Sequence, residues 1–114
     1  GLISLYAICE YPNIFNGAGC VSTHWPYDDG EMFSYFKLNL PSSKNHKIYL
    51  DYGDEALEPG YLESHNHIKH ALLKNGFIEG SSYLEKIFPG HQHSEEYFRK
   101  RAHIPLEFLL NKRE

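Results

Sequence analysis

The sequence of 114 residues is long enough for one small globular domain, and its 41% hydrophobic and 15% aromatic residues exclude a disordered chain. Its formal net charge of −4 argues against nucleic acid as a partner, because nucleic-acid-binding domains carry basic patches. No apolar run approaches the ~20 residues that cross a bilayer, and the first residues show no signal-peptide pattern, so we expect no membrane partner and leave a cytoplasmic and a secreted or periplasmic location equally open.

The first forty residues predict two helices with a strand between them. Residues 2–11 are almost entirely apolar or small, which is typical of a buried helix, and Pro12 ends it. Residues 15–22 are rich in glycine and small side chains and predict a short buried strand. Residues 31–40 place their large apolar side chains on one side and predict a second helix, which stops before Pro41.

The remaining residues continue the alternation of strands and helices. Residues 47–52 predict a second strand, and residues 61–74 predict a long helix. Residues 82–88 predict a third strand. The last helix begins at Ser94, a favourable N-cap, and extends towards residue 110, with a break or a kink at Pro105.

Strands that alternate with helices of about ten residues or more indicate a parallel sheet. We therefore predict one α/β domain over residues 1–114, with about three parallel strands and four helices. Three parallel strands rarely form a complete sheet, because parallel sheets are normally covered on both faces and extended by further strands. Since Gly1 leads directly into an apolar segment, we expect a preceding strand to be missing. We expect the chain to associate with its missing N-terminal half or with a second copy of itself.

Three loops are expected to follow the carboxyl ends of the predicted strands, where sites of open α/β sheets form. The first loop contains Ser22, Thr23, His24 and Trp25, the second contains Asp54, Glu55 and Glu58, and the third contains His91 and His93. A carboxylate loop followed by a histidine loop matches the acid-then-histidine order of serine hydrolases. In such a pair the histidine takes a proton from a nucleophile and the carboxylate orients it.

Segments of the chain, taken in order, resemble one family of α/β-hydrolases, the serine esterases that include esterase D-like, feruloyl-esterase-like and enterobactin-esterase-like enzymes. The segments are GLISLYA at residues 1–7, YPNIF at 11–15, STHW at 22–25, IYLDYG at 48–53, FPGHQHSE at 88–95, Arg101, and PLEFL at 105–109. Their order and spacing carry the resemblance, which covers nearly all of this chain but under half of a typical member. It implies the C-terminal part of an α/β-hydrolase fold.

The resemblance also implies site residues. His93, beside the N-cap of the last helix, matches the general base of the family, and His91 is the competing candidate. The acid would be Glu58, five positions after the glycine of its loop, or Asp54 directly after that glycine. His24 and Trp25 are the candidates for substrate binding, although Trp25 equally suits a core anchor.

The main departure from the family is the nucleophile, since the sequence contains no G-x-S-x-G. Gly1 would be the last glycine of the nucleophile elbow, so the serine and the oxyanion donors would precede this chain. We expect a small carboxylic ester as the substrate of the intact enzyme, no cofactor, and no acyl-enzyme formed by these residues alone.

Two other hypotheses about the function remain. One is a non-catalytic, self-associating α/β fragment or interaction protein, favoured by the missing elbow and the open sheet. The other is a metal module built from His65, His67 and His70, or from His91 with His93. No fixed Cys/His spacing supports a metal, so we expect none, and we expect the helix histidines to be solvated. Two cysteines in apolar segments favour buried free thiols.

Overall fold

The computed structural model describes residues 1–23, 31–54 and 61–111. The described elements are α1 (Leu2–Glu10), β1 (Gly17–Val21), α2 (Glu31–Asn39), β2 (Lys47–Gly53), α3 (Tyr61–Lys74), β3 (Tyr83–Phe88), α4 (Glu95–Arg101) and α5 (His103–Leu110).

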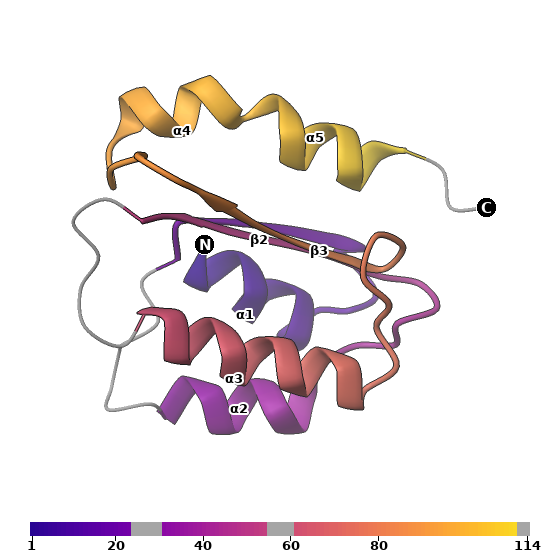
Figure 1. The fold of residues 1–114 in the computed structure, drawn as a ribbon. Helices are drawn as coiled ribbons and strands as arrows, with labels where there is room; N and C mark the ends of the chain where they lie inside the picture. Colours follow the sequence, from indigo (N-terminus) through magenta and orange to yellow (C-terminus); the bar gives the residue numbers. More distant parts are fainter. Residues whose placement is uncertain (24–30, 55–60, 112–114) are drawn as a thin grey trace.

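The three strands form one parallel sheet in the order β1-β2-β3, which confirms the predicted α/β fold. The central strand β2 is buried along its whole length. Figure 1 shows α1, α2 and α3 on one face of the sheet and α4 and α5 on the other. Because all strands run in one direction, the loops that follow them meet at one edge of the sheet.

The main core lies between the sheet and the first three helices. Alternate residues of β1 and β2 turn their apolar side chains towards α1, α2 and α3, as the period of two of a strand requires. The buried cluster consists of Leu5, Ile8, Cys9, Ala18, Cys20, Phe36, Ile48, Leu50, Ile68, Leu72, Phe77 and Tyr83. Both cysteines are free and buried, as expected. Burial raises the pKa of each thiol to about 12.

The opposite face carries α4 and α5, which the sequence predicted as one last helix, broken or kinked at Pro105. The expected interruption is present as a break, but its predicted position is wrong, because the helix breaks at Ala102, three residues earlier. Proline has no N–H to donate to the carbonyl four residues before it, and its ring clashes with that carbonyl. For Pro105 that residue is Arg101, so α4 ends there and Pro105 lies in the first turn of α5.

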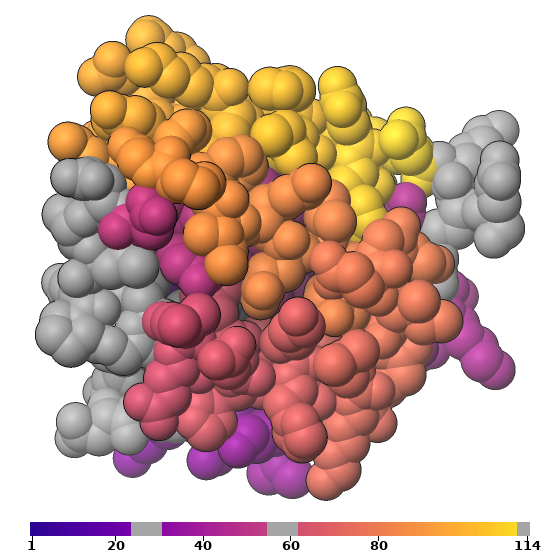
Figure 2. All heavy atoms as spheres, viewed as in Figure 1, coloured from indigo at the N-terminus to yellow at the C-terminus, as the bar shows by residue number. Residues whose placement is uncertain are grey.

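Glycines of β1 let α5 lie close to the sheet. A Cβ added at Gly17 or Gly19 would stand 3.2 or 3.4 Å from the Leu109 side chain, closer than most Cβ contacts. Figure 2 views the molecule from the side of β3, whose side chains fill the surface between α3 and the two C-terminal helices. None of the helices in the described part of the chain combines the length and the apolar character of a membrane span.

Candidate active site

A pocket of about 450 Å³ lies at the carboxyl edge of the sheet, where sequence analysis expected a site. Its lining comes from the start of α1, the end of β1 and the beginning of α4. The lining residues are Gly1, Leu2, Ile3, Val21, Ser22, Thr23, His93 and Phe98. The structure therefore brings His93 and Gly1, which are 92 positions apart in the sequence, to one cavity.

His93 stands at the rim of this pocket, exposed, one residue before the Ser94 N-cap of α4. Its ring meets the Phe98 ring edge-on, with centroids 5.2 Å apart and an interplanar angle of 88°. The imidazole thus lies exposed beside the cavity, where a general base would have to be placed.

His91 has a different environment from His93. Its Nδ1 lies 2.9 Å from Nη1 of Arg101, and its ring packs against Phe88 and Tyr97 with centroids 5.2 and 5.0 Å away. A guanidinium has donors and no acceptor. Nδ1 must therefore accept the hydrogen bond, which leaves the proton of a neutral imidazole on Nε2.

Arg101 is 1% exposed and contacts residues at or near the ends of all three strands. Its Nε and Nη2 each donate to one carboxylate oxygen of Asp51, at 3.2 Å in both cases, and Nη2 also donates to Oγ of Ser22. The guanidinium lies over the rings of Phe88 and Phe98, 4.9 and 5.3 Å from their centroids. A buried cation is thus neutralised and hydrogen-bonded from several elements, as burial of a charge demands.

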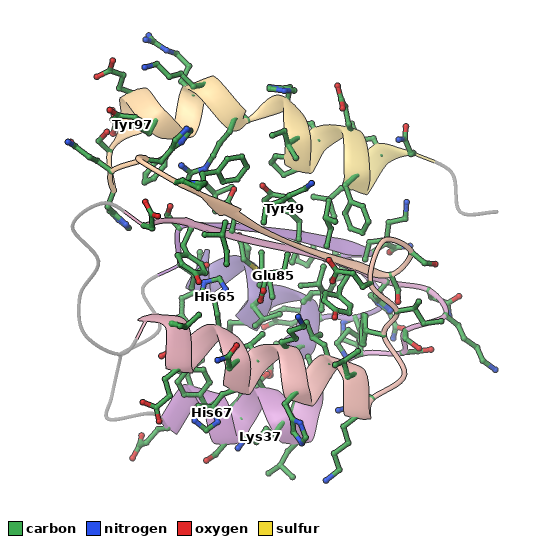
Figure 3. The ribbon with its side chains drawn as sticks, in the orientation of Figure 1. Lys37, Tyr49, His65, His67, Glu85 and Tyr97 are labelled. Carbon is green, nitrogen blue, oxygen red and sulfur yellow. The ribbon has the colours of Figure 1, made fainter. Side chains whose placement is uncertain are left out.

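Asp51 is fully buried and receives two further hydrogen bonds. The Tyr49 hydroxyl donates to it at 2.6 Å, and the Ser22 amide donates at 3.0 Å. Figure 3 shows Tyr49 on the α5 side of the sheet. Burial, together with the bond to Asp51, raises the pKa of Tyr49 well above its usual range. Ser22 has a φ of +47°, uncommon for a residue other than glycine, which marks a sharp bend where the chain leaves β1.

Asp51 and Tyr49 were not predicted as site residues, and Ser22 was predicted only as part of the first loop. The sequence did contain a signal for this cluster. Asp51 interrupts a buried apolar strand, and a buried carboxylate needs a cation or hydrogen-bond donors beside it. The partner could not be identified from the sequence, since Arg101 lies fifty positions away.

Two glycines allow the backbone to approach other groups closely at this edge. A Cβ at Gly1 would overlap the Thr23 side chain, and a Cβ at Gly53 would overlap the carbonyl group of His91. Thr23 is 1% exposed, and its hydroxyl has no hydrogen-bond partner among the described residues. The start of α1 is therefore packed directly on the end of β1, beside the pocket.

The carboxylate loop is described only at its beginning. Oδ1 of Asp54 accepts a hydrogen bond of 2.6 Å from the Gly90 amide, and the Asp54 amide donates to the Phe88 carbonyl at 3.3 Å. Asp54 thus binds the backbone that leads to His93 and forms no ion pair with its ring. Glu58 lies outside the described residues, as do the predicted substrate-binding residues His24 and Trp25.

The histidines of α3 lie in different environments. His67 and His70 are exposed, but the prediction that His65 is solvated is wrong. His65 is 1% exposed, packs against Tyr52 with ring centroids 4.2 Å apart, and has its Nδ1 3.6 Å from Glu85 (Figure 3). Within residues 1–23, 31–54 and 61–111, no three His, Cys, Asp or Glu side chains are placed to share a metal ion.

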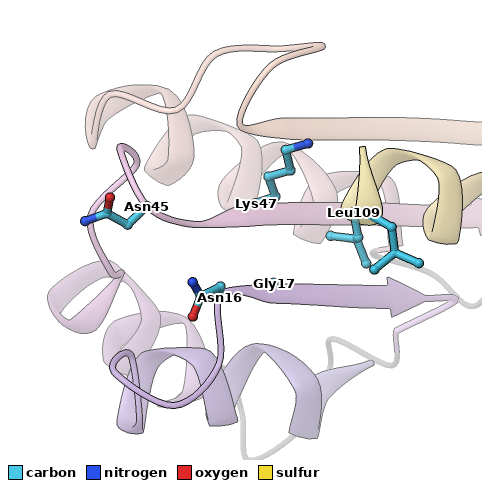
Figure 4. A pocket seen from close by; sticks show the side chains of 6 residues that line it. Asn16, Gly17, Asn45, Lys47 and Leu109 are labelled. Atoms are coloured by element: carbon cyan, nitrogen blue, oxygen red, sulfur yellow. The ribbon is translucent and has the colours of Figure 1, made fainter. Parts of the chain in front are cut away.

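A second pocket, of about 420 Å³, lies at the amino end of the sheet, beside Asn16, Asn45 and Leu109 (Figure 4). Lys47 lines it, and its ammonium donates to the carbonyls of Phe108 and Asn111 at 3.0 and 2.6 Å. The cation thereby closes the C-terminal end of α5, a place where positive charge is favourable. This pocket is remote from the histidine loop, and the charged side chain that lines it, Lys47, stabilises the end of α5.

Comparison with known proteins leaves the activity open. No protein-family model matches the chain. No solved structure matches it. The chain is similar to the uncharacterized protein YbbA of Bacillus subtilis strain 168, with 26% identity over 118 residues that cover 98% of the chain and 46% of YbbA. The chain thus spans about half the length of the curated relative it matches.

Proposed function

We propose that this chain contributes the histidine side of the active site of a serine carboxylic-ester hydrolase, as a member of the esterase family that its sequence resembles. The observation that carries the proposal is that Gly1 and His93 line one pocket. In the resemblance, Gly1 ends the nucleophile elbow. A serine placed on polypeptide immediately before Gly1 would enter the cavity that His93 borders.

In this mechanism His93 takes the proton from the serine hydroxyl as it attacks the ester carbonyl, and then gives it to the leaving alcohol. The serine becomes acylated, and water repeats the sequence in the second half of the reaction. The substrate class is a small carboxylic ester, and no cofactor is needed. His24 and Trp25 are the proposed substrate contacts.

We assign the triad acid to Glu58 in preference to Asp54. One oxygen of Asp54 is already bound to the Gly90 amide at 2.6 Å, so this carboxylate holds the histidine loop by its backbone. The acid must instead orient the imidazole of His93 through a direct hydrogen bond. Glu58→Gln is expected to lower kcat by ~100-fold or more, whereas Asp54→Asn, which keeps an amide oxygen for Gly90, is expected to lower it by less than ~10-fold.

The test uses the complete reading frame that encodes this chain, expressed and assayed with p-nitrophenyl acetate. His93→Ala is expected to lower kcat at least ~1,000-fold. The matched control is His70→Ala, which removes an exposed histidine of α3 away from the pocket and should leave kcat unchanged. Equal rates for His93→Ala and the parent would refute the proposal. The absence of a G-x-S-x-G that ends at Gly1 in the reading frame would refute it as well.

A second candidate role, association through the β1 edge, is favoured by a separate observation. β1 has a strand neighbour on one side only within the described sheet, and a pocket of about 460 Å³ lies beside it under α4 and α5. This pocket is lined mainly by apolar side chains, including Val21, Pro105, Leu106 and Leu109. An unpaired edge next to apolar surface favours pairing with another strand. For the 114-residue chain we propose a second copy as that partner, and a monomer by light scattering would refute it.

A further inference from the structure

We propose that His91 is a positioning residue, which accepts a hydrogen bond from the buried Arg101 guanidinium and thereby fixes the loop that carries His93. The catalytic consequence rests on the proposed function, but the positioning itself does not. The juxtaposition that carries the inference is the 2.9 Å contact between Nδ1 of His91 and Nη1 of Arg101.

The chemistry of the two groups determines which one donates. Arg101 has no acceptor, so the lone pair of His91 Nδ1 must point at it. The contact therefore places the ring proton on Nε2 and uses Nδ1 as the acceptor of the guanidinium N–H.

Backbone contacts around His91 restrict the conformation of the loop. The His91 amide donates to the Phe88 carbonyl at 3.2 Å, and the Gly90 amide donates to Asp54 at 2.6 Å. The His91 carbonyl group occupies the space that a Cβ at Gly53 would need. His91 is thus held on its backbone by β2 and β3 and on its side chain by α4, and His93 follows two residues later.

Phe98 provides a second connection between the guanidinium and the proposed base. Its ring lies 5.3 Å from the Arg101 guanidinium carbon and also meets the His93 ring edge-on at 5.2 Å. Displacement of the guanidinium would therefore change both the loop before His93 and the surface on which its ring rests. Arg101 in turn donates two hydrogen bonds to Asp51. The contacts that position His93 therefore extend to the central strand β2.

Two substitutions at His91 separate a hydrogen-bond role from a packing role. His91→Asn keeps an acceptor, because its Oδ1 is attached to Cγ as Nδ1 is, but it removes the ring. His91→Phe keeps a ring against Phe88 and Tyr97 but removes the acceptor, which leaves one guanidinium N–H buried without a partner. The first readout is the NMR signals of the His93 ring in the 114-residue chain, because they report the Phe98 ring contact without any need for activity.

We expect the His93 ring signals to be unchanged in His91→Asn and shifted in His91→Phe. In the complete reading frame, we expect kcat with p-nitrophenyl acetate to fall by about 10- to 100-fold in His91→Phe and by less than ~3-fold in His91→Asn. Unchanged His93 signals in His91→Phe, or shifted ones in a folded His91→Asn, would overturn the proposal. If the parent enzyme is inactive, the proposed function fails, while the NMR comparison still decides the positioning.

If His91→Phe does not fold, Arg101→Lys tests the same contact from the donor side. Lysine keeps a positive charge beside Asp51, but its single ammonium cannot replace the separate N–H groups that bind Asp51, Ser22 and His91. We expect shifted His93 signals in folded Arg101→Lys. Unchanged signals would overturn the proposal.

Discussion

Replacement of Arg101 by methionine is the most informative single perturbation of this fold. Methionine keeps a long apolar side chain but removes the guanidinium that binds Asp51, Ser22 and His91. The change leaves the Asp51 carboxylate fully buried without its counter-charge. Removal of one partner from a buried ion pair destabilises proteins by roughly 3–5 kcal/mol.

We expect the lower end of that range for Arg101→Met. Asp51 would keep the hydrogen bonds from the Tyr49 hydroxyl at 2.6 Å and from the Ser22 amide at 3.0 Å, so its desolvation is partly compensated. A loss of about 3 kcal/mol in the free energy of unfolding follows. For a domain of this size that loss corresponds to a fall in Tm of about 10 °C. Solvent screening does not reduce the effect, because both side chains are buried.

Urea unfolding followed by circular dichroism would measure this loss, with Lys100→Met as the matched control. Lys100 is the preceding residue, is half-exposed and pairs with Glu96 at 3.5 Å, so its removal should cost less than ~0.5 kcal/mol. A double-mutant cycle of Arg101→Met with Asp51→Asn should give a coupling energy of about 2 kcal/mol. A loss below about 1 kcal/mol for Arg101→Met, or additive effects in the cycle, would refute the reasoning.

Four further predictions concern buried groups. Because burial raises the pKa of Cys9 and Cys20 from 9.0 to about 12, DTNB at about pH 8 should label neither thiol in the native protein and both in urea. The unfolded chain releases these protons first, so the contribution of the two thiols to stability should be constant below about pH 9 and fall towards pH 12, which urea midpoints measured between these pH values would check. Gly53→Ala should cost about 3 kcal/mol by thermal unfolding, because its Cβ would displace the His91 carbonyl; a neutral result would contradict the close approach. Lys47→Met should accelerate amide exchange at the end of α5 and cost about 2 kcal/mol, and unchanged exchange would contradict the capping role.

Much of the fold was predictable because it depends on local pattern. The predicted bounds of α3 are those of the structure, and the predicted strand at residues 47–52 differs from β2 by one residue. Each has a long periodic or apolar run with clear ends. The break between α4 and α5 was misplaced, because a proline disturbs the carbonyl four residues before it as well as its own position. The burial of His65 depends on Tyr52 and Glu85 across the sheet, contacts that have no local signature.

The candidate site was predictable only in part. Parallel topology places the loop after each strand at one edge, so the proximity of His93 to the end of β1 follows from the element order. The distinction between His91 and His93 does not follow, since it is made by Arg101, whose partners lie 10, 50 and 79 positions away. A buried aspartate in β2 indicates that some cation must be near, but not which of the basic residues reaches it.

The two loop histidines differ in their contacts, and this difference supports the separate roles that we propose for them. His91 is half-buried, bound to a guanidinium and packed between two rings, so a change there must disturb the structure. His93 is exposed and contacts one ring edge, so His93→Ala should barely change the free energy of unfolding. An exposed histidine on a pocket that Gly1 also lines suits the role of base that we propose for it. The stability of the fold and the orientation of the proposed base therefore depend on the same buried cation, Arg101, and the two can be measured separately.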